Sequence, residues 1–253
     1  MLQVQNLCKA FGGVMATRDV SIDFPAGSLT ALIGPNGAGK TTFFNQVTGY
    51  VRPDSGRILF EGYDLARMSS LAITRLGLAR AFQVAALFPS LTAQDALAAA
   101  VTAHRRRSWQ VLAHFPGASA RERADELLDL LGLAGKADVL SSTLSHGDQK
   151  LLDIGLALAL DPKILLLDEP TAGMGPEERW QMIATVEALW KRQRLTIVFI
   201  EHDMDVVFKI AQRVHVLRYG ALLAQGTPDE IRRNPEVIDA YLGTEHDASG
   251  GQG

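Results

Sequence analysis

The sequence has almost no cysteine and no long apolar segment. Cys8 is the only cysteine among 253 residues, which excludes an intrachain disulfide and a cysteine-based metal site and fits a reducing compartment. The apolar run from Ile154 to Leu160 is far shorter than the roughly 20 residues that a membrane-spanning helix needs. The N-terminal sequence MLQV lacks the charged residues that open a signal peptide. We therefore expect neither a membrane span nor a signal peptide.

An excess of charge of either sign is also missing. The 25 Lys and Arg residues against 28 Asp and Glu residues leave a net charge of -3, without the basic footprint of nucleic-acid-binding proteins, so no nucleic-acid partner is expected. The content of 47% hydrophobic and 21% charged residues is typical of a folded globular protein and argues against disorder. The length suffices for one large domain or two small ones.

The first third of the chain alternates short β-like runs with turns. Breaks rich in proline and glycine separate these runs, and the pattern predicts an antiparallel β layer beside a central strand. The predicted strands are Leu2 to Gln5, Asp19 to Phe24, Leu29 to Ile33 and Arg57 to Phe60.

Helices are predicted from about Leu91 to Leu140. There, Ser119 and Glu122 have the spacing of a capping box, and Gly132 is expected to end that helix. After Ser145 the chain alternates helices with buried strands, which predicts a parallel sheet with crossover helices. These elements are strands Ile164 to Leu167 and Thr196 to Ile200, a helix from Glu177 to Arg192 and another from about Met204. The tail from Thr244 to Gly253 is expected to be frayed.

The most specific motif is a P-loop, GPNGAGKT, from Gly34 to Thr41. It follows an apolar strand and precedes a helix expected to begin near Lys40, which is the context that the motif requires. Glycines let backbone N–H groups turn toward phosphate oxygens, and the helix N-terminus adds a favourable dipole. Lys40 would neutralise the β- and γ-phosphates of a nucleotide, and Thr41 would offer its hydroxyl to Mg²⁺. The nucleotide-binding residues predicted here are Gly34, Asn36, Gly37, Gly39, Lys40, Thr41 and Thr42.

A second element is a buried strand that ends in two adjacent carboxylates, Asp168 and Glu169. Ligands collect at the carboxyl edge of α/β sheets. Asp168 is predicted to hold Mg²⁺ through water. Glu169, pointing the other way along the strand, is predicted to polarise the attacking water. Beside a P-loop, this pair predicts nucleotide hydrolysis.

Between these motifs, the segment LSHGDQ from Leu144 to Gln149 resembles LSGGQ, the signature of the ATP-binding subunits of ABC transporters. The resemblance covers about residues 1 to 242. It implies that Ser145 and Gly147 bind the γ-phosphate of ATP held by the P-loop of a second subunit. His146 and Asp148 depart from the signature. From the residues themselves, we expect Ser145 to be the N-cap and Asp148 the N3 acid of a capping box.

The resemblance also implies a fold and further site residues. The fold is α/β, a P-loop NTPase core with an antiparallel β subdomain and an α-helical signature subdomain. The ATP-binding domain would span 1–243, with the helical subdomain at about 84–160 and a flexible tail at 244–253. Phe11 resembles the aromatic residue that stacks on adenine, Gln83 the glutamine that meets Mg²⁺, and His202 the histidine that contacts the γ-phosphate. Gly175 stands where the family's crossing loop normally ends in aspartate.

Four segments have sequences that resemble importer ATPases of the high-affinity branched-chain amino acid type: residues 77–83, 171–174, 200–204 and 226–243. This implies an ATPase that uses ATP and Mg²⁺ to power uptake of branched-chain amino acids or similar small solutes. Its partners would be integral membrane permease subunits, a second ATPase subunit and, indirectly, a periplasmic substrate-binding protein. It would lie peripherally on the cytoplasmic face of the plasma membrane.

Three alternatives stay open at this point: an ATPase of the lipopolysaccharide-export type, a soluble ABC ATPase, and a P-loop kinase of small molecules. A kinase would leave Ser145 and His202 without a purpose. The soluble members that act on chromosomes or ribosomes carry long coiled-coil inserts or a second cassette, and the sequence has neither. The transported substrate does not follow from these residues, because the family places substrate contacts in other subunits.

Overall fold

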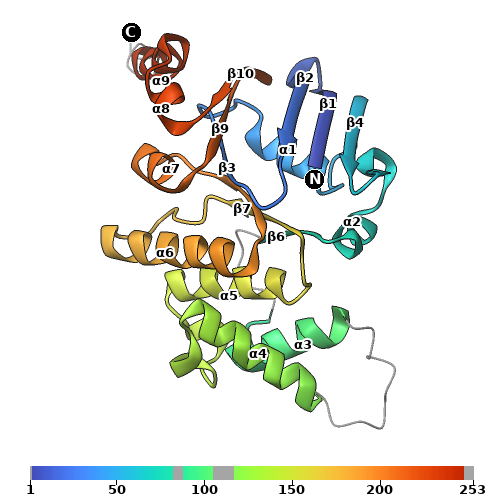
Figure 1. Ribbon diagram of the computed structural model, residues 1–253, viewed down its shortest axis with the longest axis vertical. Coiled ribbons are helices and arrows are strands. Elements are labelled where there is room, and N and C mark those ends of the chain that lie inside the picture. Colours follow the sequence, from blue (N-terminus) through green and yellow to red (C-terminus); the bar gives the residue numbers. More distant parts are fainter. Residues whose placement is uncertain (1, 82–87, 105–116, 248–253) are drawn as a thin grey trace. The chain divides into compact units, whose positions relative to one another are not determined.

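The computed structural model describes residues 2–81, 88–104 and 117–247, with residues 242–247 described by their backbone only. The chain divides into two compact units, and Figure 1 labels the helices and strands that are named below. Unit 1 comprises Met1–Ile73 and Thr196–Gly253, and unit 2 comprises Thr74–Leu195. Among the described residues, no helix is both long and apolar enough to cross a membrane.

Unit 1 contains the predicted antiparallel layer, a sheet in the order β2-β1-β4-β5. Its strands are β1 (Leu2–Phe11), β2 (Val14–Phe24), β4 (Ser55–Phe60) and β5 (Tyr63–Asp64). The β1–β2 hairpin is longer than predicted, since Phe11 still pairs with Val14. The two-residue turn between them is formed by Gly12 and Gly13 at φ 52° and 89°, and such turns match the twist of the paired strands.

Four further strands of unit 1 run in the order β10-β9-β3-β8. These strands are β3 (Leu29–Ile33), β8 (Thr196–Ile200), β9 (Arg213–Arg218) and β10 (Ala221–Gly226). The central strand β3 pairs in parallel with both β8 and β9, which confirms the predicted parallel sheet. Every residue of β3 and β8 is buried, as expected of parallel strands covered on both faces.

The helices of unit 1 include the one that follows the P-loop. They are α1 (Lys40–Val47), η1 (Leu65–Arg67), α7 (Met204–Ile210), α8 (Pro228–Arg232) and α9 (Pro235–Asp247), while α2 (Ser70–Leu76) crosses the sequence boundary of the units. The helix α9 continues to Asp247, into the first residues of the tail that was predicted to be frayed from Thr244. One glycine, Gly243, costs a helix only about 1 kcal/mol and does not have to end it.

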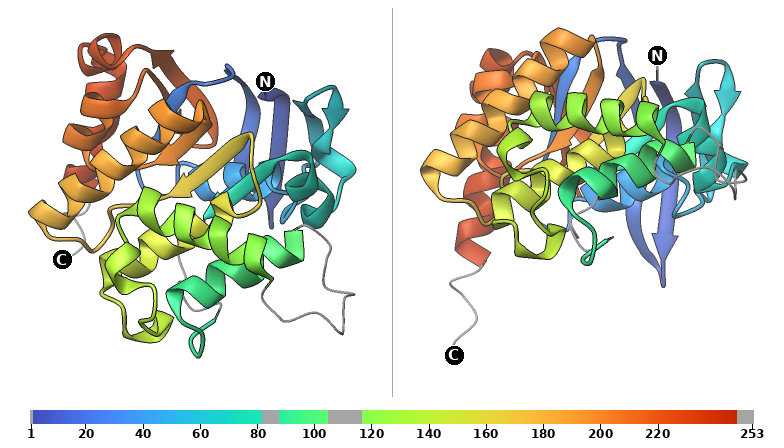
Figure 2. Two further views of the ribbon diagram at one scale, coloured as in Figure 1. Left: turned by 60° about the horizontal axis from the view of Figure 1, so that its bottom comes forward. Right: turned by 90° about the horizontal axis from the view of Figure 1, so that it is seen from below.

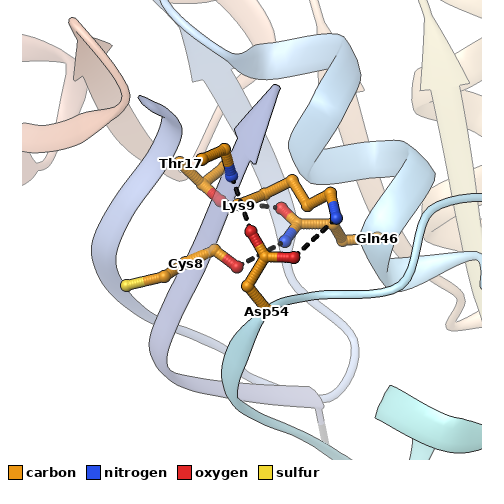
Figure 3. Close-up of polar contacts among 6 residues, drawn as sticks. Cys8, Lys9, Thr17, Gln46 and Asp54 are labelled. Atoms are coloured by element: carbon orange, nitrogen blue, oxygen red, sulfur yellow. Dashed lines mark hydrogen bonds and ion pairs between the residues drawn. The ribbon is translucent and has the colours of Figure 1, made fainter. Parts of the chain in front are cut away.

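The C-terminal half of α1 is fixed to the antiparallel sheet by buried polar contacts (Figure 3). Gln46 accepts a hydrogen bond from the Thr17 hydroxyl at 3.0 Å and donates to the Cys8 carbonyl at 3.4 Å. Both Gln46 and Thr17 are fully buried, where an unmade hydrogen bond would be costly. Lys9 and Asp54 form an ion pair at 2.6 Å nearby. The helix that begins at the P-loop is therefore held firmly at its other end.

An aromatic cluster lies in the core of unit 1. The Phe24 ring packs 6.1 Å from the Phe43 ring and meets His215 edge-on at 5.4 Å between ring centroids. Burial, together with the nearby charge of Arg213, lowers the pKa of His215 to about 4. The imidazole is therefore neutral at neutral pH and packs as an aromatic side chain.

Unit 2 contains two parallel strands, β6 (Leu78–Ala81) and β7 (Ile164–Asp168). Its helices are α3 (Ala93–His104), α4 (Ala118–Leu131), η3 (Ala134–Lys136), η4 (Ser141–Thr143), α5 (His146–Leu158) and α6 (Pro176–Gln193). The helices α3, α4 and α5 pack side by side (Figure 2). Gly155 permits this approach, because a Cβ atom there would lie 2.7 Å from Leu131 and 3.0 Å from Leu97.

The predicted start of α4 was wrong. The helix begins at Ala118 with Gly117 as its N-cap residue, without a side-chain cap hydrogen bond, so Ser119 and Glu122 form no capping box. Glycine is an acceptable N-cap, and the chain turns helical before it reaches the serine. The predicted end is confirmed, since Gly132 takes the left-handed conformation at φ 72°.

Candidate functional site

The P-loop of unit 1 joins β3 to α1, with Lys40 as the first residue of the helix. The Lys40 side chain is buried, and its ammonium donates to the carbonyls of Gly34 at 2.6 Å and Pro35 at 3.0 Å. The lysine is thus folded over the loop that precedes it. This places a buried positive charge where the sequence predicts the phosphates.

Two glycines of the loop lie where no other residue fits. A Cβ atom at Gly34 would be 2.1 Å from the Leu217 carbonyl oxygen, and one at Gly39 would be 2.2 Å from the Ala16 carbonyl oxygen. Gly39 also has φ 100°, a conformation that residues with a side chain rarely adopt. At Gly37, by contrast, an added Cβ atom would have no neighbouring atom within 4 Å. The loop is therefore packed against unit 1 at its ends and open in the middle.

The N-terminus of α1 suits an anion. No side chain caps it, and no acidic residue lies in its first turn. The helix dipole and the Lys40 ammonium act in the same direction, and both favour negative charge. The other predicted nucleotide-binding side chains, Asn36, Thr41 and Thr42, lie in the same loop and first turn, the first two exposed and the third half-buried.

His202 lies at the same edge of unit 1 as the P-loop. Leu32 in β3 pairs with Ile200 in β8, so the residues that follow the two strands leave the sheet side by side. His202 is exposed, and its backbone N–H donates to the buried Glu201 carboxylate at 3.2 Å. The structure thus brings His202 and the P-loop to one sheet edge, the edge at which α/β proteins bind ligands.

Phe11 is the last residue of β1 and lies outside the core. Half of its surface is exposed, and the Lys9 ammonium lies 5.3 Å from the centroid of its ring. An exposed ring is available for stacking, as the predicted contact with adenine requires. Gln83, the predicted Mg²⁺ contact, lies outside the described residues.

The two carboxylates of unit 2 differ in their surroundings. Asp168 is the last residue of β7, is buried, and forms an ion pair with Arg80 of β6. Glu169 is half-buried and does not continue the strand as predicted, because its backbone turns to φ 50°. Its direction is therefore set by a left-handed backbone rather than by strand alternation.

Ser145 and Gly147 lie at the start of α5, as predicted. The Ser145 hydroxyl accepts a hydrogen bond from the backbone N–H of Asp148 at 3.2 Å, which confirms Ser145 as the N-cap. In a capping box the N3 side chain accepts a hydrogen bond from the backbone N–H of the N-cap residue. Here the short Asp148 side chain instead accepts hydrogen bonds from the Ser145 hydroxyl at 2.7 Å and from Lys136. Burial would raise the pKa of Asp148, but these hydrogen bonds lower it.

Lys150, on the next turn of α5, was not among the predicted site residues. Its ammonium donates to three backbone carbonyls of the loop that carries the candidate base, those of Glu169 at 2.9 Å, Pro170 at 3.3 Å and Ala172 at 2.8 Å. A lysine on a helix is ordinarily solvated, so the sequence offers no signal for this contact. Unit 2 therefore joins the Ser145 helix directly to the Glu169 loop.

Comparison with known proteins places these motifs in a family. The family model described as ABC transporter matches residues 17–172, and one described as branched-chain amino acid ATP-binding cassette transporter matches residues 221–247. The chain is 38% identical over 249 residues to the high-affinity branched-chain amino acid transport ATP-binding protein LivG of Escherichia coli K12, covering 96% of this chain and 98% of LivG. It is 37% identical over 251 residues to BraF, the corresponding protein of Pseudomonas aeruginosa, with the same coverage.

A solved structure has the same fold. The ADP conformation of MJ1267, an ATP-binding cassette of an ABC transporter, matches with a TM-score of 0.85 and 29% sequence identity. The match covers 96% of this chain and 98% of that cassette. The predicted α/β, P-loop NTPase fold class is confirmed by this likeness.

Proposed function

The chain belongs to the ABC transporter family of ATP-binding proteins, and on that premise we propose that it is the ATPase subunit of an importer for branched-chain amino acids or similar small solutes. The observation that carries the proposal is the P-loop, which lies against the buried Lys40 ammonium and the uncapped N-terminus of α1. A nucleoside triphosphate supplies the negative charge that this arrangement favours.

We assign the nucleotide contacts within unit 1 to the P-loop, Phe11 and His202. The P-loop amides and Lys40 would bind the phosphates, and the exposed Phe11 ring would stack on the base. His202, at the neighbouring strand end, would contact the γ-phosphate. In the second half of the proposed site, Glu169 would take a proton from the attacking water.

Mg²⁺ fits this site as an ion held mainly by phosphates. Among the described residues, no group of three or more His, Cys, Asp and Glu side chains is placed to hold a metal ion. Mg²⁺ usually binds through one or two protein groups together with substrate phosphates and water, so a sparse donor set suffices. Thr41, Asp168 and Gln83 are the proposed protein contacts. The ion would neutralise charge that develops on the transferred phosphoryl group.

The importer assignment draws on the relatives. LivG and BraF are named as branched-chain amino acid transport proteins, and the C-terminal match at residues 221–247 is to a model of the same type. We propose integral permease subunits as partners, with a second ATPase subunit and, indirectly, a periplasmic binding protein. The chain would lie peripherally on the cytoplasmic face of the membrane.

The partners can be identified directly. The tagged chain, purified from native membranes in mild detergent, is expected to carry permease subunits whose genes are required for branched-chain amino acid uptake, with mass spectrometry as the measurement. A Lys40→Ala chain serves as a matched bait that lacks the nucleotide-binding lysine. Recovery of lipopolysaccharide-export subunits instead, or of no membrane protein, would contradict the importer assignment and favour one of the two ABC alternatives.

A mixing experiment tests whether Ser145 acts on ATP bound by a second subunit. Ser145→Arg alone and Lys40→Ala alone each damage both composite sites of a homodimer, whereas a mixed dimer keeps one site intact. ATP hydrolysis is therefore expected to reappear when the two inactive variants are combined. The control is each variant mixed with itself. A mixture that stays inactive although heterodimers are demonstrated by cross-linking would count against the role across the dimer.

A further inference from the structure

The loop after β7 has a backbone that needs support from outside. Glu169 has φ 50°, in the left-handed region that is sterically unfavourable for a residue with a side chain. Such residues persist where surrounding structure holds them, and they gather at functional sites. Within the loop itself, the Glu169 carbonyl accepts one backbone hydrogen bond, from the N–H of Ala172 at 3.2 Å.

Lys150 supplies that support from the neighbouring helix. A lysine ammonium has three N–H donors, and here it is within hydrogen-bond distance of the carbonyls of Glu169, Pro170 and Ala172. One cation therefore gathers three carbonyl oxygens of a four-residue turn, and hydrogen bonds from a charged donor are about twice as strong as neutral ones. The side chain is half-buried, which reduces competition from water.

A second side chain of α5 lies against the same loop. His146 is one helical turn before Lys150, so both project from one face of the helix. The His146 Nε2 atom lies 3.4 Å from the Ala172 carbonyl oxygen. A Cβ atom added at Gly173 would also lie 3.4 Å from this Nε2 atom. His146, one of the two positions at which the sequence departs from the family signature, thus faces the loop that carries Glu169.

We propose that Lys150 is a positioning residue for hydrolysis, which fixes the backbone of Glu169 so that its carboxylate faces the attacking water. The proposal rests on the proposed role of Glu169 as the base. Lys150 touches neither the nucleotide nor the water in this assignment, and it acts through the three carbonyls. Its loss should therefore lower turnover without weakening ATP binding, because the phosphate contacts are made by other residues.

The decisive variant is Lys150→Met, which keeps the length of the side chain and removes all three donors. In the purified full-length chain, kcat for ATP hydrolysis is expected to fall by about 10-fold or more, as misplacement of a catalytic group by about 1 Å can cost up to 100-fold. KM for ATP and the affinity for a fluorescent ATP analogue should stay within about twofold of the wild type. Lys150→Arg, which keeps a charged donor, should recover most of the loss.

Two further variants separate positioning from a general structural effect. Lys191→Met removes a lysine of the same unit that pairs with Glu187 at 2.7 Å on α6, and it should leave kcat unchanged. In a Glu169→Gln background, Lys150→Met should lower turnover by less than about twofold, because a side chain that no longer acts as the base gains nothing from being positioned. Circular dichroism checks folding, and Lys150→Gln replaces the methionine variant if that one is unfolded.

Each outcome decides the proposal. Wild-type kcat in Lys150→Met, no recovery in Lys150→Arg, or an undiminished loss in the Glu169→Gln background would overturn the positioning role. These results differ from a failure of the proposed function, which would show as absent hydrolysis in the wild type or as unchanged hydrolysis in Glu169→Gln. A normal loss in Glu169→Gln with full activity in Lys150→Met would overturn the positioning role alone.

Discussion

Lys40→Ala is expected to lose nearly all MgATP binding and hydrolysis. The variant keeps the glycine backbone of the loop and the N-terminus of α1, but it loses the buried ammonium that now bonds the carbonyls of Gly34 and Pro35. That ammonium is the cation predicted to meet the β- and γ-phosphates, and a removed electrostatic contact of this kind costs about 100-fold or more in turnover. Equilibrium binding of a fluorescent ATP analogue and steady-state phosphate release measure the two losses.

The control must separate lost binding from a collapsed loop. Without nucleotide, the variant should unfold thermally within a few degrees of the wild type, because this substitution at the first residue of α1 leaves the apolar core unchanged. With MgATP, the wild type should gain in unfolding temperature and Lys40→Ala should not, because a ligand that binds the folded state stabilises it. Lys191→Ala, which alters a surface ion pair, should behave as the wild type. Near-normal turnover in Lys40→Ala would rule out the P-loop assignment.

The sequence predicted those elements whose signal is local. Both β3 and β8 have the predicted bounds, because each is a short, mostly apolar run that stops at a glycine or a charged residue, Gly34 or Glu201. The P-loop and the start of α1 followed from a motif whose glycines are needed for backbone packing. The hairpin of β1 and β2 was underestimated, since polar residues such as Asn6 and Asp19 interrupt its apolar alternation on exposed positions.

What the sequence could not predict are contacts between distant residues and unusual backbone angles. Arg80 and Asp168 are 88 positions apart, and their ion pair exists only because β6 and β7 are neighbours. No propensity indicates a left-handed conformation at Glu169, since glutamate rarely adopts one. The contacts of Lys150 with three carbonyls are likewise not predictable, because they depend on the shape of the turn that follows β7. The motifs thus predict the chemistry of the site, whereas the contacts that support it cannot be predicted from the sequence.

The Arg80 contact also decides which carboxylate is the better probe. Asp168 is buried in an ion pair, and removing one member of such a pair leaves the other charge uncompensated, at a cost of about 3–5 kcal/mol. A loss of activity in a variant of Asp168 would therefore mix catalysis with stability. Glu169 comes after the end of β7 and its side chain is half-buried, so its charge can be removed at a smaller structural cost.

Glu169→Gln is accordingly expected to keep MgATP binding while turnover falls by about 100-fold or more, the scale for losing a general base. The amide keeps the shape of the side chain and leaves Asp168 in place, but it cannot accept the proton of the attacking water. Lys150 should still hold the loop, because its contact is with the backbone carbonyl of Glu169 rather than the carboxylate.

With hydrolysis blocked, ATP should stay between the P-loop of one subunit and the Ser145 helix of another. Glu169→Gln is therefore expected to elute from gel filtration as a dimer in the presence of MgATP and as a monomer without it, whereas the wild type returns to monomer as ATP is consumed. Adding Ser145→Arg to the variant is the matched control, since it should abolish the dimer while Lys40 still binds nucleotide. Hydrolysis at the wild-type rate in Glu169→Gln would exclude the role of base. A slow variant that stays monomeric with MgATP would instead argue that the partner is a second, different ATPase subunit, because turnover reports on the base and elution reports on self-pairing.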